Sequence, residues 1–269
     1  MIRFLILSGY FELMMYLQIT GKLDQYINAH YNYLIYLSMI LSLILAIVQL
    51  YLWVKNNNQS SHLTTKFQRA TALLIMSIPL LIGLFFPTVS LDAAIVDAKG
   101  FNFPLSKEST GDDQVKTQYL QPDTSFYFTK SDYSDMMEKV KKKYLNNDVI
   151  SVTSENYMEV MEAIYDFPNE FSGKQIEMSG FVYLDPTDQT HNIFLFRFGI
   201  IHCIADSGVF GLLTQFEEAK DFKNNQWINV KGTIQSDYYK PFNRNLPSIK
   251  VETVKAISTP KNQYVYRAF

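Results

Sequence analysis

The sequence has a single cysteine, Cys203, among its 269 residues. One cysteine excludes an internal disulfide and a zinc site built from several cysteines. The sequence also lacks a glycine-rich phosphate loop, a His-Glu-x-x-His motif, a Gly-x-Ser-x-Gly motif and a carboxylate pair of distinctive spacing. The formal net charge is −2, so the charge balance does not point to nucleic acid. We therefore expect a non-enzymatic protein that binds no nucleic acid, and the sequence identifies no cofactor.

Charge is also scarce in residues 1–86. That segment holds two acidic residues, Glu12 and Asp24, and five basic ones: Arg3, Lys22, Lys55, Lys66 and Arg69. Charged residues of both signs are frequent beyond it. This division predicts a transmembrane anchor at 1–86, a juxtamembrane linker at 87–124 and a water-soluble domain at 125–269.

Three apolar segments are candidate transmembrane helices. Residues 33–54 carry no charge and are long enough to cross roughly 30 Å of hydrocarbon as a helix. Residues 2–19 are shorter, and a signal peptide is the alternative, but no small-x-small cleavage site follows them. Residues 70–86 contain Pro79 and Gly83, which membrane helices tolerate when neighbouring helices satisfy the freed backbone groups. We expect about three helices in the lipid bilayer, with two as the alternative.

The orientation follows from the loop between the second and third candidate helices. This loop carries Lys55, Lys66 and Arg69 and no acidic residue. Because positively charged loops stay in the cytoplasm, we expect a multi-pass protein of the cell membrane with a cytoplasmic N-terminus. The soluble domain is then extracytoplasmic.

Glu12 is the one ionisable residue deep in a candidate helix. A carboxylate in lipid is costly and usually faces a partner or a cavity. Glu12 is therefore a candidate contact to a membrane partner, or part of an ion path. The alternative is a first helix that begins lower in the bilayer, with Glu12 protonated or hydrogen-bonded to Tyr16 one turn later.

The first part of the soluble domain has helical patterns. Residues 131–145 begin with a serine cap and acidic residues and end in lysines, as a helix dipole favours. A short strand is expected at 149–152. The next helix should begin at Ser154 or Glu155 and stop before Pro168, with Met158 and Met161 on its apolar side.

From residue 173 onward the pattern is typical of β-strands. Ile176-x-Met178-x-Gly180 and Ile228-x-Val230-x-Gly232 share one outline, an alternating strand with a glycine where a bulge or sharp bend is expected. Further strands are expected at 193–204, 209–213 and 248–256. Five short, curved strands predict an OB-like β-barrel at 173–258. The expected fold class is thus an α-helical membrane anchor plus an α+β soluble domain that contains a five-stranded OB-like barrel.

An aromatic and basic loop follows the fourth of these strands, with Tyr238, Tyr239, Phe242 and Arg244. Such side chains can stack on a ligand. Aromatic residues are abundant throughout the chain, however. We therefore favour packing of this loop or contact with a partner.

The stretch "RFGIIHCIADSG", residues 197–208, places His202 beside Cys203 with Asp206 close behind. In a continuous strand over 194–204, alternate side chains face opposite sides, so His202 and Cys203 point apart. Asp206 falls in a turn-forming sequence. The favoured interpretation is a structural strand and turn. A ligand or metal site at His202, Cys203 and Asp206 is the second possibility, and nucleophilic catalysis, for which a base would have to activate Cys203, is the third.

The chain resembles the YcgQ family of bacterial membrane proteins nearly from end to end. The resemblance is carried by "LQITGKLDQYIN", "FSGKQIEMSGFVY", "LFRFGIIHCIADSG", "WINVKGTI" and "TPKNQYVY". These motifs make Arg197, Gly180, Gly232 and Trp227 candidate signature residues. The family has two adjacent cysteines where this chain has His202 and Cys203, and a Cys-to-His exchange keeps the ability to bind a metal. It argues against an obligatory local disulfide.

Members of that family are commonly encoded beside a polytopic permease of the YcgR type. The resemblance therefore implies an accessory subunit whose external domain docks on the permease or presents substrate to it. The alternative function is an extracytoplasmic ligand- or metal-binding sensor on a membrane anchor.

Overall fold

The computed structural model describes residues 1–55, 63, 65–86, 90–99, 130–188, 190, 192–217 and 221–267. The chain divides into two compact units, Met1–Ser90 and Leu91–Phe269. Much of the expected linker at 87–124 lies outside the described residues.

The first unit is helical. Its long helices are α1 (Ile2–Ile19), α2 (Asn32–Val54) and α3 (Lys66–Phe85), with short 3₁₀ turns η1 (Leu23–Gln25) and η2 (Ala29–Tyr31) before α2. In the described part of the chain, three helices are long and apolar enough to cross a membrane, and they correspond to these three. The prediction of three candidate membrane helices is therefore confirmed.

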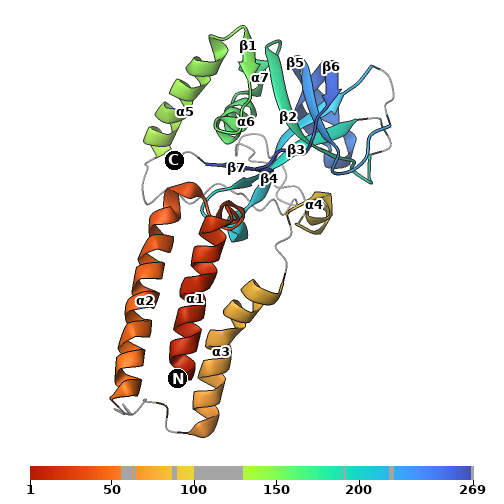
Figure 1. Cartoon of the computed structure of the whole chain (residues 1–269). Coiled ribbons are helices and arrows are strands. Elements are labelled where there is room, and N and C mark those ends of the chain that lie inside the picture. The colour runs from red at the N-terminus through yellow and green to blue at the C-terminus, as the bar shows by residue number, and fades with distance from the viewer. Residues whose placement is uncertain are drawn as a thin grey trace. The chain divides into compact units, whose positions relative to one another are not determined.

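Helix α1 lies between α2 and α3 (Figure 1). Pro79 within α3 has no backbone N–H and disturbs the turn before it. In that turn the carbonyl of Met76 accepts a hydrogen bond of 2.8 Å from the hydroxyl of Tyr10 on α1. A hydrogen bond from a neighbouring helix thus lies in the turn that precedes the proline.

The second unit combines helices with one sheet (Figure 1). Its helices are α4 (Ala93–Lys99), α5 (Lys130–Leu145), α6 (Tyr157–Asp166) and α7 (Pro168–Phe171), and its 3₁₀ turns are η5 (Ile204–Asp206) and η6 (Lys240–Phe242). Its strands are β1 (Val149–Ser151), β2 (Gln175–Tyr183), β3 (Ile193–Ile200), β4 (Gly208–Gln215), β5 (Trp227–Tyr239), β6 (Arg244–Ala256) and β7 (Tyr264–Tyr266). The expected α+β class is confirmed, and every predicted strand is present.

The sheet has the order β1-β2-β5-β6-β4-β3-β7, and β2 also pairs with β3. That additional pairing closes β2, β5, β6, β4 and β3 into a ring. Within the ring β4 and β6 run parallel, and the other neighbours are antiparallel. The short strands β1 and β7 extend β2 and β3 in parallel.

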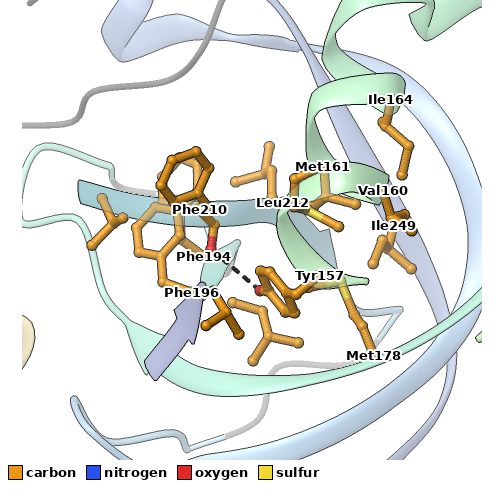
Figure 2. Packing of buried hydrophobic residues seen from close by; sticks show 14 of the residues in the cluster. Tyr157, Val160, Met161, Ile164, Met178, Phe194, Phe196, Phe210, Leu212 and Ile249 are labelled. Atoms are coloured by element: carbon orange, nitrogen blue, oxygen red, sulfur yellow. Dashed lines mark hydrogen bonds between the residues drawn. The ribbon is translucent and has the colours of Figure 1, made fainter. Parts of the chain in front are cut away.

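Helix α6 packs into the core of this unit (Figure 2). Its apolar side chains, including Met158 and Met161, are fully buried, so the methionines pack as predicted. The hydroxyl of Tyr157 donates to the carbonyl of Phe210 on β4 over 3.2 Å, and that of Tyr165 donates to Gly211 over 2.6 Å. These bonds satisfy two hydroxyls that would be costly to bury unpaired.

Three boundaries differ from the expectations. Strand β3 ends at Ile200 rather than Ile204, because the chain bends at residues 201 and 202 and enters η5. Helix α6 begins at Tyr157, after a turn in which the side chain of Asn156 accepts from Thr153 N over 2.7 Å. Helix α4 lies within the expected linker, yet Ala93 and Val96 are buried in the core of the second unit.

Candidate functional site

The loop after β3 is organised by the carboxylate of Asp206. It accepts from the backbone N–H of His202 at 3.1 and 3.0 Å and from that of Cys203 at 2.9 Å. The same carboxylate lies 2.6 Å from Nδ1 of the His202 ring. Cys203 is the N-cap residue of η5, and its backbone carbonyl accepts from the backbone N–H of Asp206 over 3.1 Å. Asp206 therefore turns the chain back on itself, which is why β3 ends early.

This geometry changes the expected relation between His202 and Cys203. The alternation argument requires a strand through residue 204, and the bend removes that premise. The His202 side chain is 54% exposed, and Cys203 is half-buried. In the described part of the chain, no group of three or more His, Cys, Asp or Glu side chains is placed to hold a metal ion. His191 lies outside the described residues. The structural interpretation accounts for the contacts, and the metal alternative stays a prediction.

Arg197 occupies a buried position beside the C-terminal segment. Its guanidinium donates to the backbone carbonyls of Asn262 at 3.0 Å and Tyr264 at 3.2 Å, and to the hydroxyl of Ser154 at 2.8 Å. No carboxylate in the described residues forms an ion pair with it. Burial lowers the pKa of Arg197, against the effects of nearby Tyr and Glu side chains. Arg197 thus joins β3 to the "TPKNQYVY" segment.

Two aromatic rings flank the Arg197 guanidinium. Its central carbon lies 5.6 Å from the centre of the Tyr157 ring and 5.6 Å from that of Trp227. A planar guanidinium is suited to such stacking, and the rings offset part of the cost of burying its charge. Trp227 also packs against Phe181 of β2, with ring centres 6.2 Å apart. Two of the four signature residues therefore meet at one place.

The two signature glycines allow close approach of strands. A Cβ atom at Gly180 would lie 2.6 Å from the carbonyl oxygen of Phe196, at the point where β2 gains β3 as a neighbour. A Cβ atom at Gly232 would lie 2.1 Å from the carbonyl oxygen of Lys250. The register between β5 and β6 shifts at Gly232, so the predicted irregularity is present there. At Gly180 the register does not shift, and the glycine instead lets the backbone of β2 lie close to that of β3.

The aromatic loop is mostly used internally. Tyr239 is buried, donates to Asp185 over 2.6 Å, and packs edge-on against Phe194 and Phe242. The guanidinium of Arg244 lies over the ring of Phe242 at 5.5 Å. Of the four residues of this loop that the sequence singled out, Tyr238 is the large aromatic residue that is exposed. These contacts agree with packing of the loop.

A buried ion pair was not foreseen from the sequence. Nη2 of Arg267 lies 3.3 Å from Oε1 of Glu162 on α6, and both side chains are almost fully buried. Burial raises the pKa of Glu162 to about 7, although the charge of Arg267 opposes that shift. The signal in the sequence was Glu162 between apolar residues of a predicted helix, but its partner lies 105 residues away.

In the first unit, Glu12 is exposed on α1. Within the described residues it makes no hydrogen bond or ion pair. The expected alternative, a bond to Tyr16, is not formed; the Tyr16 hydroxyl accepts from Lys22 Nζ at 3.5 Å. The carboxylate of Glu12 is therefore open to the surroundings of α1.

Comparison with known proteins finds matches over both units. One family model, described as the DUF1980 N-terminal domain, matches residues 2–102, and another, the DUF1980 C-terminal domain, matches residues 127–267. The chain is 52% identical over 273 residues to a Streptococcus mutans protein named "Putative two-component membrane permease complex subunit". It is 38% identical over 287 residues to the UPF0703 protein YcgQ of Bacillus subtilis. Both alignments cover 100% of this chain and 100% of the relative.

Proposed function

The chain belongs to the DUF1980 family, as the resemblance to YcgQ predicted, and we propose that it is the membrane-bound accessory subunit of a two-component permease. Its three apolar helices anchor it in the bilayer. Its soluble unit docks on, or presents substrate to, a polytopic partner of the YcgR type. The observation that carries this proposal is the full-length similarity to the Streptococcus mutans protein, whose name describes such a subunit.

The composition of the anchor supports an accessory role. Within the three helices, Arg3, Lys66 and Arg69 lie in terminal turns, and Glu12 is the one charged residue far from an end. Paths for ions or polar solutes are lined by several polar or ionisable side chains. Three helices with a single inner carboxylate offer little of this kind. The transport path of the complex is therefore assigned to the partner.

The same proposal assigns the soluble unit to the OB-like type. Support comes from the closed ring of β2, β3, β4, β6 and β5 and from its one parallel pair, β4 with β6. Small closed rings need sharp local curvature, and Gly180 and Gly232 lie where neighbouring backbones approach closely. Closure also leaves few open strand edges, which suits a domain that presents a fixed surface to a partner.

We assign no catalytic role to the soluble unit. The names of the two relatives describe no reaction. The carboxylate of Asp206 contacts Nδ1 of His202, and it also accepts two backbone N–H groups and closes the loop. Its position is explained by the fold of that loop.

The proposed orientation places the N-terminus in the cytoplasm and the soluble unit outside. A test uses single cysteines in a Cys203→Ala background and a membrane-impermeant maleimide. Tyr26→Cys, between α1 and α2, should be labelled in intact cells, and Lys55→Cys, after α2, only in permeabilised cells. Labelling in the reverse order would overturn the orientation.

Copurification tests the proposed function. The tagged full chain is extracted from its native membrane in mild detergent, and its stable partners are identified by mass spectrometry. We expect one polytopic membrane protein in stoichiometric amount, and the same pair when the tag is moved to that protein. Recovery of the chain without any membrane protein in stoichiometric amount would contradict the proposal.

A further inference from the structure

We propose that one face of α1 binds a transmembrane helix of the polytopic partner, and that this partner helix carries a basic side chain opposite Glu12. We call this face the Glu12 face and define it by Leu5, Glu12, Tyr16 and Ile19. The inference rests on the proposed function, since it names the surface through which the two subunits meet in the membrane.

The other sides of α1 are already covered within the chain. Leu80 of α3 lies against Gly9, and Leu13 lies against Gly83 of α3. Towards α2, Nε2 of Gln18 donates to the hydroxyl of Tyr36 over 3.0 Å. Helix α1 therefore has neighbours on two sides, as Figure 1 shows.

The Glu12 face is the side that remains. Residues 5, 12, 16 and 19 are separated by seven, four and three positions, so they lie along one stripe of an α-helix. Leu5 is 53% exposed, Tyr16 is 51% exposed and Ile19 is 77% exposed, and Glu12 is exposed between them. All four defining positions are thus exposed, and Glu12 is the one charged residue among them.

Glu12 lies too deep for water to satisfy it. At roughly 1.5 Å per residue, it is about 15 Å along the axis from Ile2 and about 10 Å from Ile19. A glutamate side chain spans only a few ångströms, so it does not reach either end of the helix. Carboxylates at such depth are stable when they meet an opposite charge or a hydrogen-bond donor. None of the described residues supplies one.

The exposed side chains of α1 and α2 differ in polarity, and this difference indicates which helix surface contacts the partner protein. The outward side chains in the middle of α2, such as Leu41, Ile44 and Leu45, are apolar and half or more exposed. Lipid tails cover such a surface without cost, because they are equally apolar. Lipid does not satisfy the carboxylate of Glu12. Charge complementarity therefore selects a protein helix with a lysine or arginine for the Glu12 face, and lipid for the outer face of α2.

The test uses the full chain, expressed with its polytopic partner and purified through a tag on the chain. Glu12→Leu removes the charge and the hydrogen bonds, and Glu12→Gln keeps the shape and a donor. Leu45→Gln on α2 is the matched control, since it places the same amide on an exposed mid-helix position. We expect recovery of the partner to fall at least about tenfold in Glu12→Leu and by less in Glu12→Gln, because loss of one member of a buried charge pair is costly. Leu45→Gln should leave recovery unchanged.

A photo-crosslinking amino acid gives a second readout of the contact, which does not depend on the stability of the complex during purification. Placed at Tyr16, it should form an adduct with the polytopic partner. Placed at Tyr33 on α2, which is also exposed, it should not. Loss of the Tyr16 adduct in Glu12→Leu, at an unchanged amount of chain in the membrane, would complete the expected pattern.

The outcomes separate the two proposals. If the partner copurifies with the wild-type chain and equally with Glu12→Leu, the accessory role stands and the Glu12 face is overturned. If the Tyr16 adduct has the mass of two copies of this chain, the face is a homodimer contact and the inference is also overturned. If no polytopic protein copurifies with the wild-type chain, the proposed function itself fails.

Discussion

The guanidinium of Arg197 donates to the backbone carbonyl of Tyr264 over 3.2 Å, across 67 residues of sequence. This bond joins β3 of the ring to the C-terminal segment, which pairs with β3 in parallel through β7. Because a strand of three residues has few hydrogen bonds of its own, the buried arginine is a principal attachment of that segment. The sequence motifs on either side of this bond are thus parts of one structural unit.

Substitution of Arg197 should therefore release the C-terminal segment. Arg197→Met leaves the carbonyls of Asn262 and Tyr264 without their donor, and we expect a loss of about 2 to 4 kcal/mol in the free energy of unfolding. Arg197→Lys keeps the charge but not the planar fork, so it should recover only part of that loss. Denaturant unfolding of the full chain in detergent, followed by the fluorescence of buried Trp227, measures both. Lys255→Met, at an exposed position, is the control. Equal stability of all variants would show that the segment is held in another way.

The buried Glu162 should make stability depend on pH in a defined direction. Its pKa is raised from 4.5 to about 7, so between these values the folded chain keeps a proton that the unfolded chain has lost. Stability should then fall as pH rises from about 4.5 to 7, by roughly 1 to 3 kcal/mol. Glu162→Gln should flatten the profile of unfolding free energy in this window. Glu177→Gln, at an exposed position on β2, should leave the profile unchanged. A rise in stability over the window that Glu162→Gln removes would reverse the sign and contradict the account.

Asp206 should matter more to the loop after β3 than His202 does. Asp206→Ala removes the acceptor for two backbone N–H groups, and we expect it to cost about 1 to 2 kcal/mol. His202→Ala loses an exposed contact to Asp206 and should cost less than about 0.5 kcal/mol. Because Cys203 is the sole thiol, its rate of labelling by a maleimide reports on the loop directly. Labelling should accelerate in Asp206→Ala and not in His202→Ala. A larger effect of His202→Ala than of Asp206→Ala would contradict the role of Asp206 in closing the loop.

Gly232 should not tolerate a side chain. An added Cβ atom would come within 2.1 Å of the carbonyl of Lys250, so Gly232→Ala must push β5 and β6 apart. We expect a loss of about 2 kcal/mol or more in the free energy of unfolding, as for other overpacked sites. Thr253→Ala, at an exposed position on β6, serves as the control for a change on the same strand pair. A stable Gly232→Ala variant would mean that the bulge adapts.

The elements that the sequence predicted are those with a strong local pattern. The three apolar helices, the alternating strands β2 and β5 and the buried side of α6 each carry their signal within a short window. Strand β7 is only three residues long, and its pairing depends on Arg197 far away in the sequence. No local pattern encodes such a contact.

The candidate site shows the same limit. Arg197, Trp227, Gly180 and Gly232 were found because they lie in motifs, but the sequence did not reveal that Arg197 and Trp227 stack. The alternation rule failed after Ile200 because the strand does not continue there. The side chain of Asp206 accepts from the backbone N–H of Cys203, three residues before it, and so competes with strand pairing. The Glu162–Arg267 pair was missed because its members are distant in sequence.

The mass of the native assembly tests the central claim most directly. The full chain, 31.2 kDa, is extracted from its own membrane with surrounding lipid and measured by native mass spectrometry. The account predicts a hetero-oligomer that contains this chain and one polytopic membrane protein in fixed stoichiometry. A single species at the mass of the lone chain, or of copies of this chain only, would contradict it.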